Sequence, residues 1–210
     1  MAAAALAALA VVAPSGVRAE ANARGKELFQ LCAQCHGPEG AGNQLVLAPA
    51  IAGLPDWYIK AQLHNFKSGT RGTHPEDTGG LRMYPMSQTL KTDEDIQTMA
   101  AYVASLPARR AAPTLEGGDA TRGAKFYQVC TACHGPDGNG NQAIGSPRLT
   151  GQADWYLLST LQKLKAGIRG SYPNAVIMRG MAGTLSDEQA MRDVIAYIMT
   201  LSSQTAAIAK

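Results

Sequence analysis

The sequence has no long apolar run, few aromatic side chains and little net charge. Its longest apolar stretch, residues 1–13, is much shorter than the roughly 20 apolar residues that span a bilayer, so no membrane-crossing helix is expected. No segment alternates apolar and polar residues as a half-buried strand does, which favours an all-α fold. The formal net charge of +3 gives no reason to expect a nucleic-acid partner. With 46% hydrophobic and 17% charged residues, the composition excludes a disordered or collagen-like chain.

The apolar N-terminal stretch is typical of an export signal. Val17-Arg18-Ala19 resembles an A-x-A cleavage site, and cleavage there leaves Glu20 as the first residue. Residues 1–19 are therefore expected to be a signal peptide. No Lys or Arg precedes the apolar stretch, which departs from the usual pattern. Two alternatives remain: a truncated start, or a segment retained as a weak anchor.

The chain repeats itself. The motif Cys32-Ala-Gln-Cys35-His36-Gly37-Pro38 recurs 98 residues later as Cys130-Thr-Ala-Cys133-His134-Gly135-Pro136. Further matches continue to the end of each copy, where a shorter loop reduces the offset to 95. Residues 107–119, between the copies, hold two prolines and two glycines without apolar periodicity. We therefore predict two domains, residues 20–106 and 120–210, joined by a linker.

Three helices are expected in each copy. One lies just before each cysteine pair, around residues 25–31 and 123–129, and one begins near Trp57 or Trp155. The last helix begins at Thr92 with Asp95 as capping partner, or at Ser186 with Gln189. Its apolar residues recur at helical spacing and predict a buried stripe: Ile96, Met99, Ala100, Val103 and Leu106 in one copy, and Met191, Val194, Ile195, Ile198 and Leu201 in the other.

The repeated Cys-x-x-Cys-His motif indicates covalent haem. Two thiols three positions apart can form thioethers to the two vinyl groups of a haem while the adjacent imidazole binds its iron. Cys32, Cys35 and His36 form one such set, and Cys130, Cys133 and His134 form the other. A zinc site requires a second pair of ligands at a comparable spacing. Only His64 and His74 remain for this, and neither is repeated in the second copy. A redox dithiol of the thioredoxin type requires a βαβ context, for which there is no sign.

Methionine is the candidate for the sixth iron ligand. Met83 and Met86 correspond to Met178 and Met181 under the repeat, and both pairs are expected in irregular segments about 50 residues after the histidines. Met86 and Met181 are favoured because each precedes a Thr-Leu step into the last helix. A histidine and a thioether together raise the reduction potential and leave no position for a substrate, which favours an electron carrier over an enzyme.

These residues resemble class I cytochromes c, and two fused copies resemble the cytochrome c4 family. The resemblance rests on the Cys-x-x-Cys-His-Gly-Pro-x-Gly-x-Gly-Asn segment, the proline loop and the late methionine before a capped helix, and it spans residues 21–201. It implies an all-α protein of two tandem class I cytochrome c-like domains, each a few helices wrapped around one covalently bound haem. It also implies that the carbonyls of Pro49 and Pro147 accept hydrogen bonds from His36 and His134, the alternative being simple loop stiffening.

The resemblance leaves open the roles of three residues that recur in both copies. Trp57, Tyr58 and Arg71 are expected either to bind the haem propionates or to serve packing and solvation, and the same alternatives hold for Trp155, Tyr156 and Arg169. His64 and His74 have no histidine counterpart in the second copy and are expected at the surface.

The resemblance also implies partners. The expected function is single-electron transfer in the periplasm, free or loosely membrane-associated, from a membrane quinol-oxidising complex to a terminal oxidase or other redox enzyme. Residues 20–106 hold seven basic and nine acidic side chains, and residues 120–210 hold nine and five, an asymmetry that can steer a charged partner. Two alternatives remain: a permanently bound haem subunit of a larger dehydrogenase or oxidase, and a dihaem enzyme acting on a small redox substrate.

Overall fold

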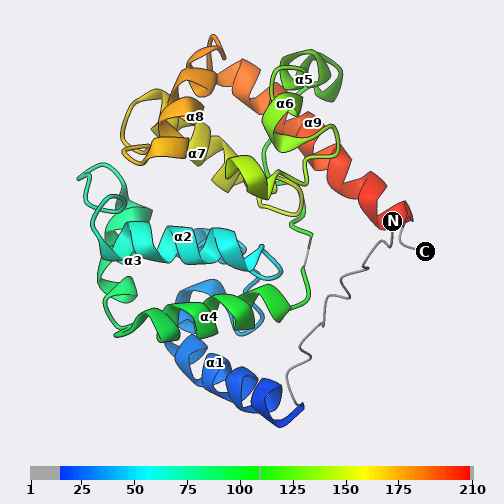
Figure 1. Ribbon diagram of the computed structural model, residues 1–210. Coiled ribbons are helices and arrows are strands. Elements are labelled where there is room, and N and C mark those ends of the chain that lie inside the picture. The colour runs from blue at the N-terminus through cyan, green and yellow to red at the C-terminus, as the bar shows by residue number, and fades with distance from the viewer. Residues whose placement is uncertain (1–14, 109, 209–210) are drawn as a thin grey trace, which may run out of the picture.

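The computed structural model describes residues 15–108 and 110–208, which form helices and loops without a β-strand (Figure 1). No described helix is long and apolar enough to cross a membrane. Most of the expected signal peptide lies outside the described residues. The two copies of the repeat form separate helical bodies that meet along one face (Figure 1).

Each body contains the same succession of helices. The first contains α1 (Ser15–His36), the short 3-10 helix η1 (Gln44–Val46), α2 (Asp56–Lys67), α3 (Thr78–Ser87) and α4 (Asp93–Ser105). The second contains α5 (Ala120–Tyr127), α6 (Thr131–His134), η2 (Gln142–Ile144), α7 (Asp154–Lys165), α8 (Pro173–Gly183) and α9 (Glu188–Ile208). The helices expected near Trp57 and Trp155 are thus confirmed. The helix before the first cysteine pair is longer than expected, because α1 continues through the motif.

A glycine lies where the first and last helices of each body cross. A Cβ atom added at Gly25 would lie 2.5 Å from the Cβ of Tyr102, and one added at Gly123 would lie 1.9 Å from the carbonyl oxygen of Asp193. Only a residue without a side chain allows the helix backbones to approach this closely. These two glycines therefore fix the crossing of α1 with α4 and of α5 with α9.

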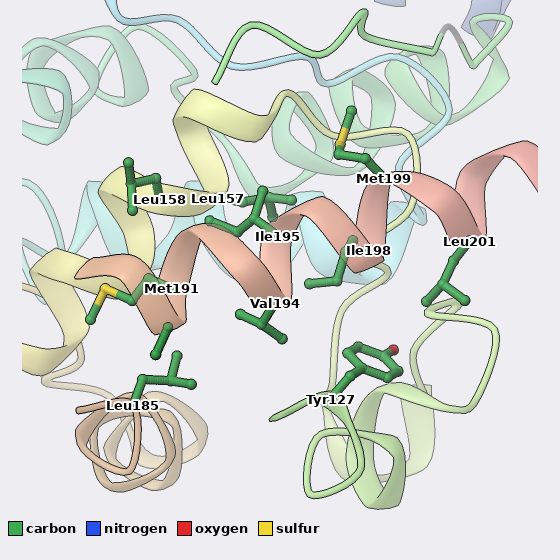
Figure 2. Packing of buried hydrophobic residues seen from close by; sticks show 11 residues of the cluster. Tyr127, Leu157, Leu158, Leu185, Met191, Val194, Ile195, Ile198, Met199 and Leu201 are labelled. Atoms are coloured by element: carbon green, nitrogen blue, oxygen red, sulfur yellow. The ribbon is translucent and has the colours of Figure 1, made fainter. Parts of the chain in front are cut away.

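The last helix of each body supplies the core, as its periodicity predicts. In α4, Ile96, Met99, Ala100 and Val103 are at most 2% exposed, and Leu106 packs against them. In α9, all five predicted stripe residues are buried, and the stripe faces Tyr127, Leu157 and Leu158 (Figure 2). Burial of a large apolar side chain contributes about 1.5–3 kcal/mol, so these stripes are a main source of each domain's stability.

The N-cap of α4 is as predicted, whereas the N-cap of α9 is not. The Thr92 hydroxyl accepts from the Asp95 amide, and the Asp95 carboxylate accepts from the Thr92 amide, so α4 has a complete capping box. For α9 the prediction of Ser186 is wrong, because the carboxylate of Asp187 accepts from the Ala190 amide instead. A carboxylate is favoured at a helix N-terminus by the helix dipole.

Candidate cofactor sites

The cysteines end the first helical segment of each body. Cys32 and Cys35 lie in the last turns of α1, and Cys130 and Cys133 lie at α6; none of the four forms a disulfide. Burial raises the pKa of the Cys32 thiol to about 11 and also raises that of Cys130.

Each motif histidine is buried and held by a proline carbonyl. His36 is 5% exposed with its Nδ1 2.8 Å from the oxygen of Pro49, and His134 is 3% exposed with its Nδ1 2.9 Å from the oxygen of Pro147. Because a carbonyl only accepts, Nδ1 carries the proton and Nε2 keeps its lone pair. Burial lowers the pKa of both imidazoles, which favours this neutral form. The Nε2 of His134 is buried without a hydrogen-bond partner, as an iron ligand requires.

A tight turn brings each proline over its histidine. Gly42 has a φ of +86°, and a Cβ atom there would lie 2.6 Å from the Ala50 amide nitrogen. Gly140 has a φ of +80°, and a Cβ atom there would lie 2.5 Å from the Ser146 carbonyl oxygen. The adjacent Asn43 and Asn141 cap η1 and η2 through their side-chain oxygens. The repeated Gly-Asn pair therefore folds the loop that positions the proline carbonyl.

Apolar side chains remain exposed near the cysteine motifs, on the proline loops and on the helices that contain the candidate methionines. They lie next to the first cysteine of each motif, around η1 and η2, and on α3 and α8: Leu31, Leu45, Leu47, Leu81, Val129, Ile144, Val176 and Ile177. Exposed apolar surface concentrated on such segments marks a binding surface for an apolar partner. A porphyrin has two apolar faces, so the residues present fit the group that the cysteine motif implies.

The four candidate methionines lie in helices, so the expectation of irregular segments is wrong. α3 continues through Met83 to Met86 with Pro85 inside it, and α8 contains Met178 and Met181. Met83 packs against the first core and Met178 against a small cluster around Leu164, whereas Met86 is 37% exposed.

The favoured methionines also share a local hydrogen bond. The hydroxyls of Thr89 and Thr184 each donate to the carbonyl of the preceding methionine, Met86 or Met181, at 2.7 Å. These bonds tie the backbone of each methionine to the end of its helix and leave the thioether out of the contact.

Two arginines lie at the interface between the bodies, so the surface alternative for them is wrong. Arg71 donates to the hydroxyl of Tyr156 at 3.0 Å, across the interface. Arg169, only 7% exposed, donates to Tyr156 at 3.3 Å and to Tyr58 of the first body at 3.5 Å. Both arginines also have a buried Nε without a partner. Trp57 and Trp155 contact the neighbouring tyrosine rings edge to face.

An interface cluster contains two guanidinium groups whose hydrogen-bond partners are hydroxyl and amide oxygens, none of them a carboxylate; its members are Tyr58, Arg71, Tyr156, Arg169 and Tyr172. Burial opposes ionisation of Tyr156, but the two positive charges outweigh it and lower the pKa of Tyr156 to about 7. A cavity of about 260 Å³ opens beside both arginines, between residues 70–75 and 167–171. This arrangement can bind anionic groups such as carboxylates.

Several interface residues were not found by sequence reasoning. Lys163 forms an ion pair with Asp77 of the other body at 2.7 Å, and Gln152 donates to the carbonyl of Ala50 at 2.9 Å. Lys163 and Gln152 are not repeated, since Asn65 and Leu54 occupy the equivalent positions in the first copy.

The two unrepeated histidines were expected at the surface. His64 is exposed as expected, while His74 is half-buried and accepts from the Glu76 amide.

Two helical bodies, each with a Cys-x-x-Cys-His motif and an imidazole held by a proline carbonyl, define a two-domain c-type haem protein. The sequence model of the cytochrome c family matches residues 22–107 and 120–202, and the chain belongs to this family. Cytochrome c4 of Azotobacter vinelandii is 34% identical over 85% of the chain and 88% of that protein. The CcoP subunit of a cbb3-type cytochrome c oxidase from Rubrivivax gelatinosus is 36% identical over 90% of the chain and 57% of that subunit.

Solved structures agree with this assignment. Reduced cytochrome c4 from Pseudomonas stutzeri matches with a TM-score of 0.70 and 29% identity, over 84% of this chain and 96% of that one. The thiosulfate dehydrogenase TsdBA from Marichromatium purpuratum matches with a TM-score of 0.71 and 33% identity, over 85% of this chain and 40% of that one. The fold is thus two tandem cytochrome c domains, and the two motifs imply covalently bound haem c.

Proposed function

We propose that this chain is a periplasmic dihaem cytochrome that carries single electrons from a respiratory donor, such as a quinol-oxidising complex, to a terminal oxidase or reductase. The observation that carries the proposal is the duplicated site: each domain has its own buried imidazole, held at Nδ1 by a proline carbonyl, directly after a cysteine pair. Similarity to cytochrome c4 over most of both chains supports the dihaem carrier.

The residues of each domain have distinct roles in this proposal. Haem c supplies a one-electron iron couple when it is bound. The cysteine pairs, Cys32 with Cys35 and Cys130 with Cys133, hold it through thioethers, so it does not dissociate. His36 and His134 bind the iron through Nε2, and Pro49 and Pro147 keep these rings in one tautomer and orientation. Met86 and Met181 would supply the second protein ligand of each iron and would exclude water and substrates.

Arg71 and Arg169 are proposed to bind haem propionates at the domain interface. The two guanidinium groups have buried, unpaired Nε atoms and hydrogen-bond to hydroxyl and amide oxygens, so neither has a carboxylate as a hydrogen-bonded counter-charge. Propionates supply that charge and match the planar donors of arginine. Each arginine also reaches a tyrosine of the opposite domain, so the same residues hold the two domains together.

The proposal includes export and domain boundaries. We propose residues 1–19 as a signal peptide, 20–106 and 120–210 as the two domains, and 107–119 as the linker. The ranges that match the family leave residues 108–119 between them, which supports the linker. Asp154 at the start of α7 accepts from the amides of Thr114 and Leu115 at 2.5 and 2.7 Å, so the end of the linker is fixed to the second domain. Free or loosely membrane-bound diffusion in the periplasm follows from the carrier role.

The proposal is tested by haem content and ligand exclusion. The exported, purified protein should carry two covalent haems, reduce reversibly in two one-electron steps, and bind no carbon monoxide in the ferrous state. A colourless protein or one with a single haem contradicts the dihaem assignment. Carbon monoxide binding by the native protein contradicts a carrier with both axial positions filled.

Two relatives favour alternative functions, and experiments on the same purified protein distinguish them from the carrier. Similarity to the CcoP subunit favours a haem subunit held permanently in an oxidase, and similarity to TsdBA favours a domain pair in an enzyme acting on a small sulfur compound. Co-purification with a partner at high salt supports the subunit. A labile ligand at one iron, together with turnover of thiosulfate, supports the enzyme.

A further inference from the structure

One hydrogen bond from the second domain reaches the loop that holds the histidine of the first. The Nε2 of Gln152 donates to the carbonyl oxygen of Ala50 at 2.9 Å, although the two residues are 102 positions apart in the chain. Ala50 directly follows Pro49, whose carbonyl oxygen lies 2.8 Å from the Nδ1 of His36. The peptide unit that Gln152 binds is therefore the next one after the peptide unit that orients His36.

Both polar atoms of the Gln152 side-chain amide have a partner. Its Oε1 accepts from the Ala153 amide at 3.0 Å, which leaves the NH2 group directed at Ala50 of the first domain. Gln152 is only 8% exposed, so water has little access to replace this contact. A buried donor that loses its partner costs free energy, and the hydrogen bond to Ala50 is thus a defined restraint between the domains.

The loop around Ala50 has little room to absorb a displacement. A Cβ atom at Gly42 would lie 2.6 Å from the Ala50 amide nitrogen and 2.7 Å from the carbonyl carbon of Pro49. The Gly42 amide in turn donates to the carbonyl of His36 at 2.8 Å. Because the loop packs this closely on backbone that leads from the histidine, a shift of the Ala50 carbonyl also moves the carbonyl of Pro49 relative to the imidazole.

The first domain cannot return this contact. Leu54 occupies the position equivalent to Gln152, and its side chain is packed in the apolar core of the first domain. Leucine has no donor, so position 54 cannot restrain the Pro147 loop that holds His134. The two histidine loops therefore differ, since the loop of the first domain alone receives a donor from this position of the repeat.

We infer that Gln152 of the second domain is a positioning residue for His36, the histidine ligand of the first haem. This inference rests on the proposed function, since it takes His36 as an iron ligand. Gln152 holds the loop in which the carbonyl of Pro49 stays aligned with the Nδ1 proton of His36. An aligned carbonyl makes the imidazole a stronger donor to the iron, which favours the ferric state. The second domain thus lowers the reduction potential of the first haem through its ligand.

The test replaces Gln152 in the full-length holoprotein by leucine, the residue of the first copy. Gln152→Leu removes the donor, so the hydrogen bond between His36 and Pro49 should weaken. Exchange of the His36 Nδ1 proton with solvent should become about fivefold faster, the value of one neutral hydrogen bond. The exchange at His134 should stay as in the wild type, and the potential of the first haem alone should rise. NMR of ferrous protein with nitrogen-15 histidine and potentiometric titration measure these changes.

A second substitution separates the lost hydrogen bond from lost packing. Gln152→Ala and Gln152→Leu both remove the donor but differ in side-chain volume. Similar increases in the exchange rate at His36 support positioning through the hydrogen bond. An increase in Gln152→Ala alone would assign Gln152 to packing and overturn the inference.

Two control variants address general loosening of the domains. Lys163→Met removes the ion pair with Asp77, a different contact between the domains, and should leave the exchange at His36 unchanged. Gln162→Leu removes an exposed amide of α7 whose partner, Glu188, lies in the same domain, and should also change nothing. If Lys163→Met accelerates the exchange at His36 as much as Gln152→Leu does, the effect belongs to the interface as a whole and the specific role of Gln152 is wrong.

Failure of the inference can be told from failure of the proposed function. If His36→Ala keeps both haems with wild-type spectra, His36 is not an iron ligand and the site of the proposed function is wrong. If His36→Ala alters or loses one haem, but Gln152→Leu changes neither exchange nor potential or changes both haems equally, only the role of Gln152 is wrong.

Discussion

Individual side chains determine which atom of each site is available to a metal. The proline carbonyls fix the Nδ1 proton of both histidines, and the polypeptide buries the imidazoles in their neutral form. Met83 and Met178 are packed against apolar neighbours, whereas Met86 is 37% exposed. Which atom of a residue can bind a metal therefore depends on which of its atoms already has a hydrogen-bond or packing partner.

Removing one candidate sulfur ligand should open one iron. We expect Met86→Ala and Met181→Ala each to retain both haems, since the cysteines are intact, but to bind one carbon monoxide per protein in the ferrous state. Carbon monoxide titration followed by visible spectroscopy measures this. Met83→Leu and Met178→Leu are matched controls and should exclude carbon monoxide. If the controls open an iron while Met86→Ala and Met181→Ala do not, the assignment within each pair is reversed.

Arg169→Gln should lower a reduction potential. A buried positive charge beside a haem favours the ferrous form, so its removal should shift the potential of at least one haem downward, on the order of tens of millivolts. Potentiometric titration of wild type and variant is the measurement. Arg192→Gln, which removes a guanidinium paired with Glu188 on α9, is the control and should leave both potentials unchanged. Unchanged potentials in Arg169→Gln would assign this residue to packing alone.

At the scale of elements, helix crossings and caps hold each domain together. The crossing of α5 with α9 requires Gly123, and the start of α5 is tied to α9 by Asp193, which accepts from the Asp119 amide and the Arg122 guanidinium. The same crossing in the first domain has Gly25 but carries Thr98 in place of Asp193. The helix arrangement is therefore repeated, but its polar reinforcement differs: Arg24, the counterpart of Arg122, pairs with Asp95 of α4 at 3.2 Å.

Gly123→Ala should destabilise the second domain. The added methyl group would lie 1.9 Å from a backbone oxygen that cannot move independently of α9, so the helices must separate. We expect a loss of about 1–3 kcal/mol in the free energy of unfolding, measured by denaturant titration of the holoprotein. Gly79→Ala places its methyl group 3.5 Å from the nearest atom and serves as the control. Equal effects of the two variants would show that the crossing tolerates a side chain.

The contact of Asp193 should make stability sensitive to acid. The hydrogen bond from Arg122 lowers the pKa of Asp193 to about 2, below the roughly 3.9 of an unfolded aspartate. Its contribution is therefore present above about pH 4 and is lost as the pH falls toward 2.

Asp193→Asn should remove about 2 kcal/mol at neutral pH, and its stability should depend less on pH between about 4 and 2 than that of the wild type. Thermal unfolding at several pH values tests this. Glu188→Gln, at an exposed ion pair, should behave as the wild type. Parallel acid curves for wild type and Asp193→Asn would contradict the assignment.

In the whole molecule, two separately built domains share one interface. Each domain has its own apolar core, while the interface is formed by polar contacts from Arg71, Arg169, Gln152 and the Lys163–Asp77 pair. The interface therefore depends on charge and hydrogen bonding, which respond to the redox state and the haem propionates more than an apolar contact does.

Removing the second attachment site should leave the first intact. Cys130→Ala combined with Cys133→Ala should halve the covalent haem content, because the first domain folds around its own core and its own haem. Haem content is measured from the alkaline pyridine spectrum per mole of protein. Loss of both haems would show that the domains do not fold separately.

The sequence by itself determined the repeated features: the cysteine motifs, the helical content and the apolar stripes of α4 and α9. These follow from local chemistry, since a covalent attachment motif and a 3.6-residue period can be read from neighbouring residues. The cap of α9, the helical setting of the methionines and the interface arginines were predicted wrongly or left open. Each depends on what lies beside the residue in space.

The contact between Lys163 and Asp77 shows this limit most clearly. The two residues are 86 positions apart, have no charged counterparts in the repeat, and meet only because α3 and α7 lie on facing sides of the domain interface. Only the tertiary structure decided that this pair forms, because the energy of an ion pair depends on distance and burial, which sequence spacing between domains does not specify.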